Sequence, residues 1–282
     1  MMRKIYFLFL FLAAFLSVNA QTALDSTTTD SLQTDSVASK AIQQTVQLAA
    51  NVVPSKAAAD SAYAKESYAD AVALYEGILN TGKESADIYY NLGNSYYKMK
   101  NIAKAILNYE RALLLNPGDN DIRFNLKLAQ SKTVDNITPM SEVFLITWFK
   151  SLTNIVSEKG WSKIAIVCFV LSLILIAIYI FSKQILWKKV GFIFAIVFIL
   201  ICILSNVFAS VQKSELVGHN AAIVMSPSVT IKSTPNESGN ELFILHEGTK
   251  VLIKDNTMKE WKEIKLEDGN VGWIPADAIE II

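Results

Sequence analysis

Two long stretches without a charged residue, 164–182 and 190–211, most constrain what this chain can fold into. Each is about long enough to cross a hydrocarbon core of roughly 30 Å as a helix rising ~1.5 Å per residue. Lys183, Lys188 and Lys189 stand between them, and positive residues in short loops mark the cytoplasmic side of a membrane. We therefore expect a two-helix transmembrane hairpin with spans 162–182 and 190–211, joined by a cytoplasmic turn at 183–189.

The first residues predict export. Residues 1–20 combine a basic start, an apolar run and small residues before Gln21, as in a signal peptide cut after Ala20; an uncleaved anchor is the alternative. Residues 21–55 are rich in Ser, Thr, Asp, Gln and Ala, so we expect a flexible polar linker that cannot bury enough apolar surface to fold. Export and the lysine turn together predict a bacterial inner-membrane protein with two spans and with both terminal domains in the periplasm.

Small and large residues recur at fixed intervals between Ala86 and Pro117. Small residues leave room where two helices approach closely, tyrosines fill the adjacent gaps, and a proline ends the second helix. This is the pattern of a tetratricopeptide repeat (TPR), a helix–turn–helix unit of about 34 residues. The packing signature consists of Tyr89, Leu92, Gly93, Tyr96, Ala105, Tyr109, Ala112 and Pro117.

The repeat array is expected to be short. One repeat earlier, Ala71 and Tyr75 match Ala105 and Tyr109, and one repeat later Leu126 matches Leu92. We therefore expect a TPR domain at 56–135 with about two repeats and one capping helix, an all-α solenoid fragment. About three repeats are usually needed to bury a continuous core, so contact with another chain would complete this domain.

The first helix of each TPR unit lines a concave face that commonly binds a partner. An aromatic and amide surface there suits an extended peptide or a partner helix; a solvated face without a partner is the alternative. Asp60, Asp121 and Asn125 depart from the subclass of TPR domains that clamps a terminal carboxylate. The candidate partner-binding residues are Asp87, Tyr90, Asn94, Tyr97, Lys98 and Phe124.

Residues 136–160 place apolar residues at helical spacing beside lysines. Two interpretations stay open for this segment. It forms either a helix that lies in the membrane interface or an amphipathic linker that packs on the repeat domain.

Residues 218–282 change to about five short alternating strands separated by turn formers, with Asp268-Gly269 as a hairpin signal. This pattern predicts a small all-β barrel, and the segment resembles a bacterial Src-homology-3 (SH3) domain. The resemblance makes Trp261 and Pro275 a possible ligand face, although Ala278 replaces one groove tyrosine and argues against polyproline binding. Trp273 is expected to anchor the core. A peptide- or glycan-binding module and a purely structural cap stay open.

The fold class is thus mixed and multidomain: a TPR solenoid fragment, a transmembrane hairpin and an SH3-like barrel. This order, with NLGNSYYKMKNIAKAILNYERALLLNPGDNDIRFNLKLAQ and the final GWIPADAIEII as the closest stretches, resembles the BatE family encoded in bacterial aerotolerance (Bat) operons. The resemblance implies a scaffold whose partners are von Willebrand factor A-type Bat proteins and other envelope components.

The remaining residues give little support for chemistry. Lys and Arg together number 26, as do Asp and Glu, so no nucleic-acid partner is expected. Cys168 and Cys202 lie in the apolar runs, and His219 and His246 are isolated, so no catalytic, cofactor or metal site is expected. We predict a non-enzymatic, membrane-anchored scaffold. The alternative is a peptidoglycan- or peptide-binding envelope protein that acts through the barrel.

Overall fold

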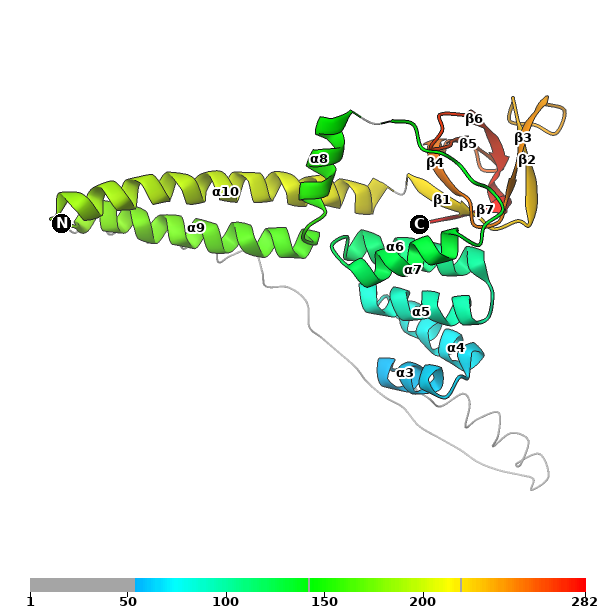
Figure 1. Cartoon of the computed structure of the whole chain (residues 1–282), viewed down its shortest axis with the longest axis horizontal. Helices are drawn as coiled ribbons and strands as arrows, with labels where there is room; N and C mark the ends of the chain where they lie inside the picture. The colour runs from blue at the N-terminus through cyan, green and yellow to red at the C-terminus, as the bar shows by residue number, and fades with distance from the viewer. Residues whose placement is uncertain (1–53, 142, 219) are drawn as a thin grey trace, which may run out of the picture. The chain divides into compact units, whose positions relative to one another are not determined.

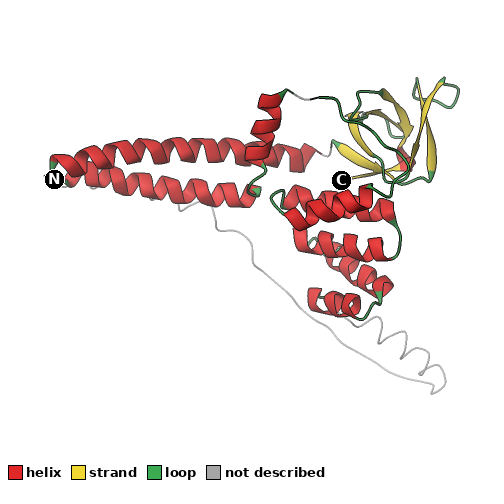
Figure 2. Ribbon diagram, viewed as in Figure 1, coloured by secondary structure: helices red, strands yellow, loops and turns green. Residues whose placement is uncertain are grey.

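A computed structural model of the chain describes residues 54–141, 143–218 and 220–282 (Figure 1). The expected signal peptide at 1–20 and nearly all of the expected linker at 21–55 lie outside the described residues. Within the described ranges, helices α3 to α10 are followed by an antiparallel sheet of strands β1 to β7 (Figure 2).

The first five described helices form two antiparallel pairs and a single last helix: α3 (Lys56–Ala64), α4 (Tyr68–Leu79), α5 (Ala86–Lys98), α6 (Ile102–Leu115) and α7 (Asn120–Gln130). The turns within the two pairs share one conformation, because Glu66 and Lys100, one repeat apart, have φ angles of 61° and 63°. Four of these helices have an N-cap residue whose side chain accepts a hydrogen bond from the first turn: Ser55, Ser85, Asn101 and Asp119. The first pair therefore has the same turn as the second, although its sequence matches the repeat pattern less well and α4 begins without a side-chain cap.

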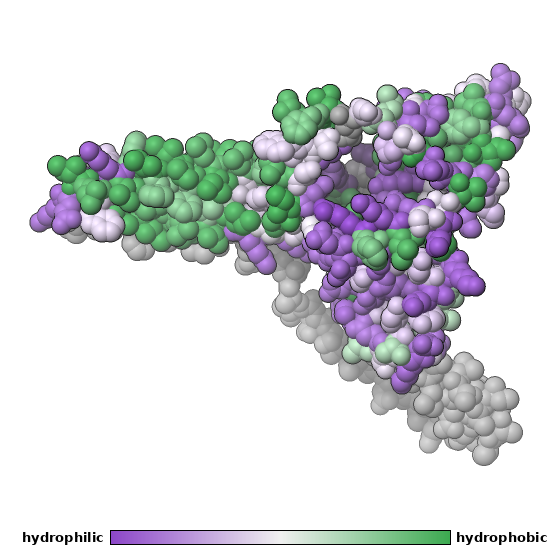
Figure 3. Space-filling model, viewed as in Figure 1, coloured by the Kyte–Doolittle hydropathy of each residue, from purple (hydrophilic) through white to green (hydrophobic). Residues whose placement is uncertain are grey.

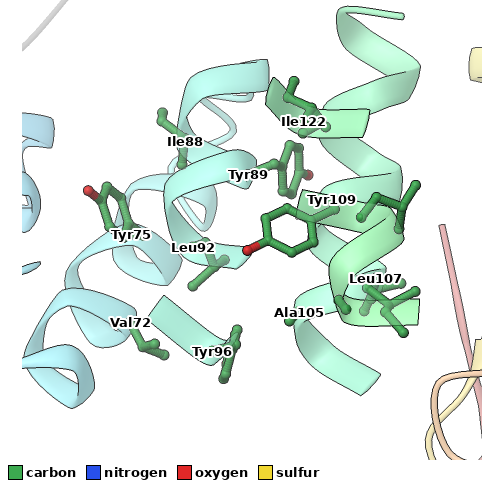
Figure 4. Close-up of a cluster of buried hydrophobic side chains, with 14 of the residues drawn as sticks. Val72, Tyr75, Ile88, Tyr89, Leu92, Tyr96, Ala105, Leu107, Tyr109 and Ile122 are labelled. Carbon is green, nitrogen blue, oxygen red and sulfur yellow. The ribbon is translucent and has the colours of Figure 1, made fainter. Parts of the chain in front are cut away.

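The packing signature forms the centre of the helical core, and all eight of its residues are buried (Figure 4). Gly93 is the point of closest approach between α5 and α6. A Cβ atom added there would lie 2.7 Å from two ring carbons of Tyr109 and 3.3 Å from the carbonyl oxygen of Ala105. Only glycine fits at this position without moving the tyrosine ring or the backbone of α6.

Three helices follow: α8 (Phe144–Thr153), α9 (Glu158–Phe181) and α10 (Ile185–Gly218). By length and composition, α9 and α10 could each cross a membrane. They are joined by only three residues, 182–184, so the expected turn at 183–189 is too long. Lys188 and Lys189 are the fourth and fifth residues of α10, because this helix already begins at Ile185.

The C-terminal residues form a sheet in the order β3-β2-β6-β5-β4-β1-β7, in which every pair is antiparallel. Ile264 opposite Gly272 sets the register of β5 and β6, and the buried core of the sheet includes Val224, Ile231 and Ile274. The expected strands are present, and β3 and β7 are additional. These two strands end the described order, so the structure shows an antiparallel sheet and does not show the expected barrel. The strands are β1 (Ala221–Val224), β2 (Ser228–Lys232), β3 (Glu241–His246), β4 (Lys250–Asp255), β5 (Trp261–Lys265), β6 (Val271–Pro275) and β7 (Ile279–Ile281).

The sheet packs on α6 through β1 and through the residues at the end of the chain. Ile223 of β1 and the final residue Ile282 belong to the same buried cluster as the helical core. Arg111 of α6 donates hydrogen bonds to a carboxylate oxygen of Glu280 at 3.1 Å and to the carbonyl of Ile281 at 2.6 Å. The chain's own strands therefore cover the last complete repeat, where the sequence suggested that another chain would do so.

A further ion pair and a hydrogen-bonded carboxylate also connect the helices to the sheet. Lys250 of β4 contacts the carboxylate of Glu110 at 2.7 Å, and that side chain is only 7% exposed. Asp135, after α7, accepts hydrogen bonds from the backbone N–H of His246 at 2.7 Å and from the Thr249 hydroxyl at 2.6 Å, and it pairs with His246 Nδ1 at 2.7 Å. Burial raises the pKa of Asp135, but these hydrogen bonds outweigh burial and hold that pKa below its ordinary value.

Replacing Gly93 should disrupt the repeat domain. Gly93→Leu would force a side chain into the contact between α5 and the Tyr109 ring, and we expect a loss of about 3 kcal/mol or more in the stability of these helices. Hydrogen exchange of the full-length protein would show this as faster exchange in peptides from 86–115. Ala69→Leu is the control, because Ala69 is an exposed residue of α4. Equal protection in both variants would contradict the packing of this repeat.

Candidate protein-binding site

The first helices of the array, α3, α5 and α7, are joined by a polar network. In the second repeat, the Tyr109 hydroxyl of α6 donates to Asn94 Oδ1 of α5 at 2.8 Å. Asn125 Nδ2 of α7 donates to the same oxygen at 3.3 Å. The amide oxygen of Asn94 thus receives one hydrogen bond from its own repeat and one from the next.

The same arrangement occurs one repeat earlier. The Tyr75 hydroxyl of α4 donates to Asp60 Oδ1 at 2.5 Å, and Asn91 Nδ2 of α5 donates to that oxygen at 3.2 Å. Each participant lies one 34-residue repeat before its counterpart. The two networks therefore form a polar ladder along the first helices, composed of Tyr75, Asp60 and Asn91 in one rung and of Tyr109, Asn94 and Asn125 in the next.

The second rung also holds one of the predicted binding residues. Asn125 Nδ2 donates to the Tyr90 hydroxyl at 2.7 Å, and the rings of Tyr90 and Tyr109 lie 6.0 Å apart at 46°. Tyr90 and Asn94 of α5 thus meet α7 through a single side chain. This fixes the orientation of a half-exposed aromatic ring, which lowers the entropy lost when such a ring binds a partner.

The shifted pKa values of the ladder residues determine which groups donate hydrogen bonds and which accept them. Burial raises the pKa of Tyr75 and Tyr109 above the ordinary tyrosine value, so both hydroxyls stay protonated and can donate. Burial also raises the pKa of Asp60, but hydrogen bonds from Tyr75, Lys56 and Asn91 outweigh it and lower that pKa. Asp60 is therefore an ionised acceptor near neutral pH, whereas Asn94 is a neutral one.

Outside the ladder, the predicted face presents exposed side chains. Asp87 and Lys98 lie near opposite ends of α5 and are exposed, and Tyr97 is half-buried. Phe124 of α7 is 67% exposed, and Leu128, one turn later on the same helix, is 38% exposed. Because residues four apart on a helix share a side, these two form an apolar surface beside Tyr90. We call the exposed side chains of α3, α5 and α7 the first-helix face.

Part of the ladder could be identified from the sequence. Tyr75, Asn94 and Tyr109 were predicted as repeat or binding residues, whereas Asp60 and Asn125 were considered only as departures from another subclass and Asn91 was missed. Asp60 lies one repeat before Asn94, and Asn91 lies one repeat before Asn125, so the repeat spacing is the signal that could have connected them. Leu128 was also missed, and its position one turn after Phe124 would have indicated it.

The possible ligand face of the sheet exposes less of its tryptophan than the sequence predicted. Trp261 of β5 pairs with Pro275 of β6 in the sheet register, but Trp261 is only 9% exposed. Trp273 is half-buried and lies outside the buried cluster of the sheet, so the expectation that Trp273 anchors the core is wrong. Trp261 is also outside that cluster, but it is almost fully covered, which leaves little of its ring for a ligand.

Comparison with known proteins supports the repeat assignment. The family model of the tetratricopeptide repeat matches residues 86–119, the same unit that the packing signature delimits. No curated protein matches the chain. Within the described residues, no group of three or more His, Cys, Asp or Glu side chains could hold a metal ion.

The ladder predicts a difference in acid sensitivity between the two repeats. The lowered pKa of Asp60 means that its ionised form stabilises the fold above about pH 4, and that this contribution is lost as the pH falls through the folded-state pKa. Asp60→Asn copies the rung of the second repeat and removes this titration. We therefore expect urea unfolding, followed by helical circular dichroism, to lose less stability between about pH 5 and pH 3 in Asp60→Asn than in the parent.

Other carboxylates such as Asp135 titrate in both proteins and cancel in this comparison. An equal loss of stability in parent and variant would show that the rung does not depend on the charge of Asp60.

Proposed function

We propose that this chain is a non-enzymatic, membrane-anchored scaffold of the bacterial cell envelope that binds a partner protein through its TPR domain. The observation that carries the proposal is the first-helix face. It combines a fixed aromatic ring at Tyr90, amide groups at Asn94 and Asn125, and the exposed Phe124. TPR repeats suggest protein–protein interaction, and apolar anchors surrounded by polar groups are typical of such interfaces.

The membrane anchor is the hairpin of α9 and α10, and the exposed apolar side chains along both helices support it. Ile166 is 60% exposed, Ile193 is 58% exposed and Leu200 is 55% exposed. Within the described residues, the most apolar stretch of each helix is only 17% buried, so neither is enclosed by protein in the way that a core helix would be. Lipid would cover this surface.

The orientation and the cellular setting complete the proposal. The lysines around the hairpin turn support a cytoplasmic position for that turn, and with it a periplasmic position for the TPR domain and the C-terminal sheet. The resemblance to the BatE family supports an assembly with von Willebrand factor A-type Bat proteins, and it supports an SH3-like assignment for the sheet. The role is interaction, without cofactor, metal or catalysis.

The alternative function, binding of peptidoglycan or peptides through the SH3-like module, depends on Trp261 and Pro275. Trp261 is buried, so the module offers no exposed aromatic platform at the predicted position. The first-helix face offers one. For this reason the scaffold is the better supported function.

The orientation can be tested with a reporter that is active only outside the cytoplasm. Fused after Ile282, it should be active, because the sheet follows the second span. Inserted at Lys183, in the turn between α9 and α10, it should be inactive. Activity in the turn and none at the C-terminus would reverse the proposed topology.

The binding face can be tested with one exposed side chain. Phe124→Ala removes a 67% exposed ring without creating a cavity, and we expect a loss of about 2 kcal/mol in partner binding, which is roughly a thirtyfold loss of affinity. The measurement is co-purification of envelope proteins with the full chain from membranes. Leu242→Ala is the matched control, since Leu242 is 47% exposed on β3. Loss of the partner in Leu242→Ala and retention in Phe124→Ala would move the binding site to the sheet.

A further inference from the structure

Helix α8 leaves its apolar side chains uncovered. Phe144 is 76% exposed, Leu145 is 68% exposed and Trp148 is 54% exposed, and Thr153 is the buried residue of this helix. Five apolar residues share one side by their spacing of three or four: Phe144, Leu145, Trp148, Phe149 and Leu152. A helix that served as an ordinary linker would bury this side against the protein.

The polar side of α8 faces the repeat domain instead. Thr147, Lys150 and Ser151 line a cavity together with Arg123 of α7 and Gly118. The side that turns toward Arg123 and Gly118 is therefore the polar one.

On the apolar side, Phe149 lines a second cavity with Glu110 and Leu114 of α6, whereas Phe144, Leu145 and Trp148 are each more than half exposed. Most of the apolar side is thus not packed on the repeat domain, which argues against the interpretation of α8 as a linker that buries this side there.

The C-terminal end of α8 is fastened to the hairpin. The Thr153 carbonyl accepts a hydrogen bond from Gln212 Nε2 of α10 at 2.7 Å and another from Trp161 Nε1 of α9 at 2.8 Å. The Phe208 ring of α10 packs edge-on against Phe149 at 5.5 Å and against Trp161 at 4.9 Å. We call these contacts the hairpin clasp.

The hairpin clasp lies where the uncharged segments begin and end. Trp161 directly precedes the span expected at 162–182, and Gln212 directly follows the span expected at 190–211. Figure 1 shows α8 running across the direction of α9 and α10 from this end, and Figure 3 shows hydrophobic surface on the hairpin and again on α8. A helix that crosses the hairpin at this level lies along the membrane plane when the hairpin spans the membrane.

We propose that α8 is an interfacial helix whose apolar side enters the outer leaflet of the bilayer, with phospholipid as its occupant. The inference rests on the membrane hairpin of the proposed function. Trp148 and Trp161 are the residue type that favours the boundary between headgroups and acyl chains, and the exposed Lys163 stands at the same level to meet phosphate groups. Such helices sit about 5–10 Å into the boundary region.

The consequence concerns the repeat domain. Because α8 is joined to α7 by only thirteen residues, 131–143, and Asp135 within them is bound to the sheet, the helix holds the TPR domain and the sheet close to the membrane surface. A partner of the first-helix face must then reach that surface. Membrane-bound proteins meet this requirement.

The test places nitroxide labels on the full chain, reconstituted in vesicles of phosphatidylethanolamine and phosphatidylglycerol. Both native cysteines are first replaced, Cys168→Ala and Cys202→Ala. Single labels then go to Leu145→Cys on the apolar side of α8 and Ser151→Cys on its polar side. Collision of each label with oxygen, which concentrates in lipid, is compared with collision with a water-soluble nickel complex. We expect the Leu145 label to favour oxygen and the Ser151 label to favour nickel.

Two reference labels make the result decisive. Ile244→Cys replaces a 54% exposed apolar residue of β3, and it should favour nickel; Phe194→Cys replaces a 50% exposed residue inside α10, and it should favour oxygen. If the Phe194 label favours oxygen and the Leu145 label matches Ile244, the hairpin stands and the interfacial helix is refuted. A Leu145 label shielded from both reagents would mean that protein covers α8, which also refutes it. A Phe194 label that favours nickel would overturn the hairpin itself.

Discussion

The covering of α6 by the C-terminal strands is the contact on which the rest of the described structure depends. An array of two TPR repeats and one extra helix exposes the apolar side of its last second helix, and so short a core is marginal in isolation. Ile223 and Ile282 fill that side, while the ion pairs of Arg111 with Glu280 and of Lys250 with Glu110 border it. Glu110 is almost fully buried, so its pairing with Lys250 is a requirement of the packing, because an unpaired buried carboxylate costs several kcal/mol.

This contact also decides which surface is left for a partner. The second helix of the last complete repeat, α6, is covered by the chain's own sheet, whereas the first-helix face remains open. Its ladder of hydrogen bonds links α3, α5 and α7 through Asp60 and Asn94. A binding surface built on helices that are fastened to one another loses less conformational entropy on binding than a set of independent helices. The fold therefore stabilises the array through the contact of α6 with the sheet, and it holds the first-helix face in a fixed conformation on the opposite side of the array.

Much of the helical part could be predicted from the sequence, because its contacts are local. Gly93 and Tyr109 are sixteen residues apart and repeat a known spacing, so their contact follows from the pattern. The junction could not be predicted, since Arg111 and Glu280 are far apart in the chain and no periodicity connects them. The sheet could be predicted in part. Alternation of apolar and polar residues indicated most of its strands, but β7 has only three residues and β3 lacks strict alternation, so these two strands were missed. The burial of Trp261 could not be predicted either, because it lies outside the buried cluster of the sheet and the sequence of one strand does not show what covers it.

The proposal of an interfacial helix rests on geometry where the sequence of α8 leaves two interpretations open. Apolar residues at helical spacing describe equally a helix that covers a protein core and one that lies in lipid. What separates the two is the direction of the polar side, and here Thr147 and Lys150 turn toward Arg123 of the repeat domain. The hairpin clasp at Thr153 then places the apolar side at the level where the uncharged helices begin. In the proposed arrangement, the residues that anchor α8 to the hairpin also determine how close to the membrane surface the first-helix face lies, and a membrane-bound partner fits that position best.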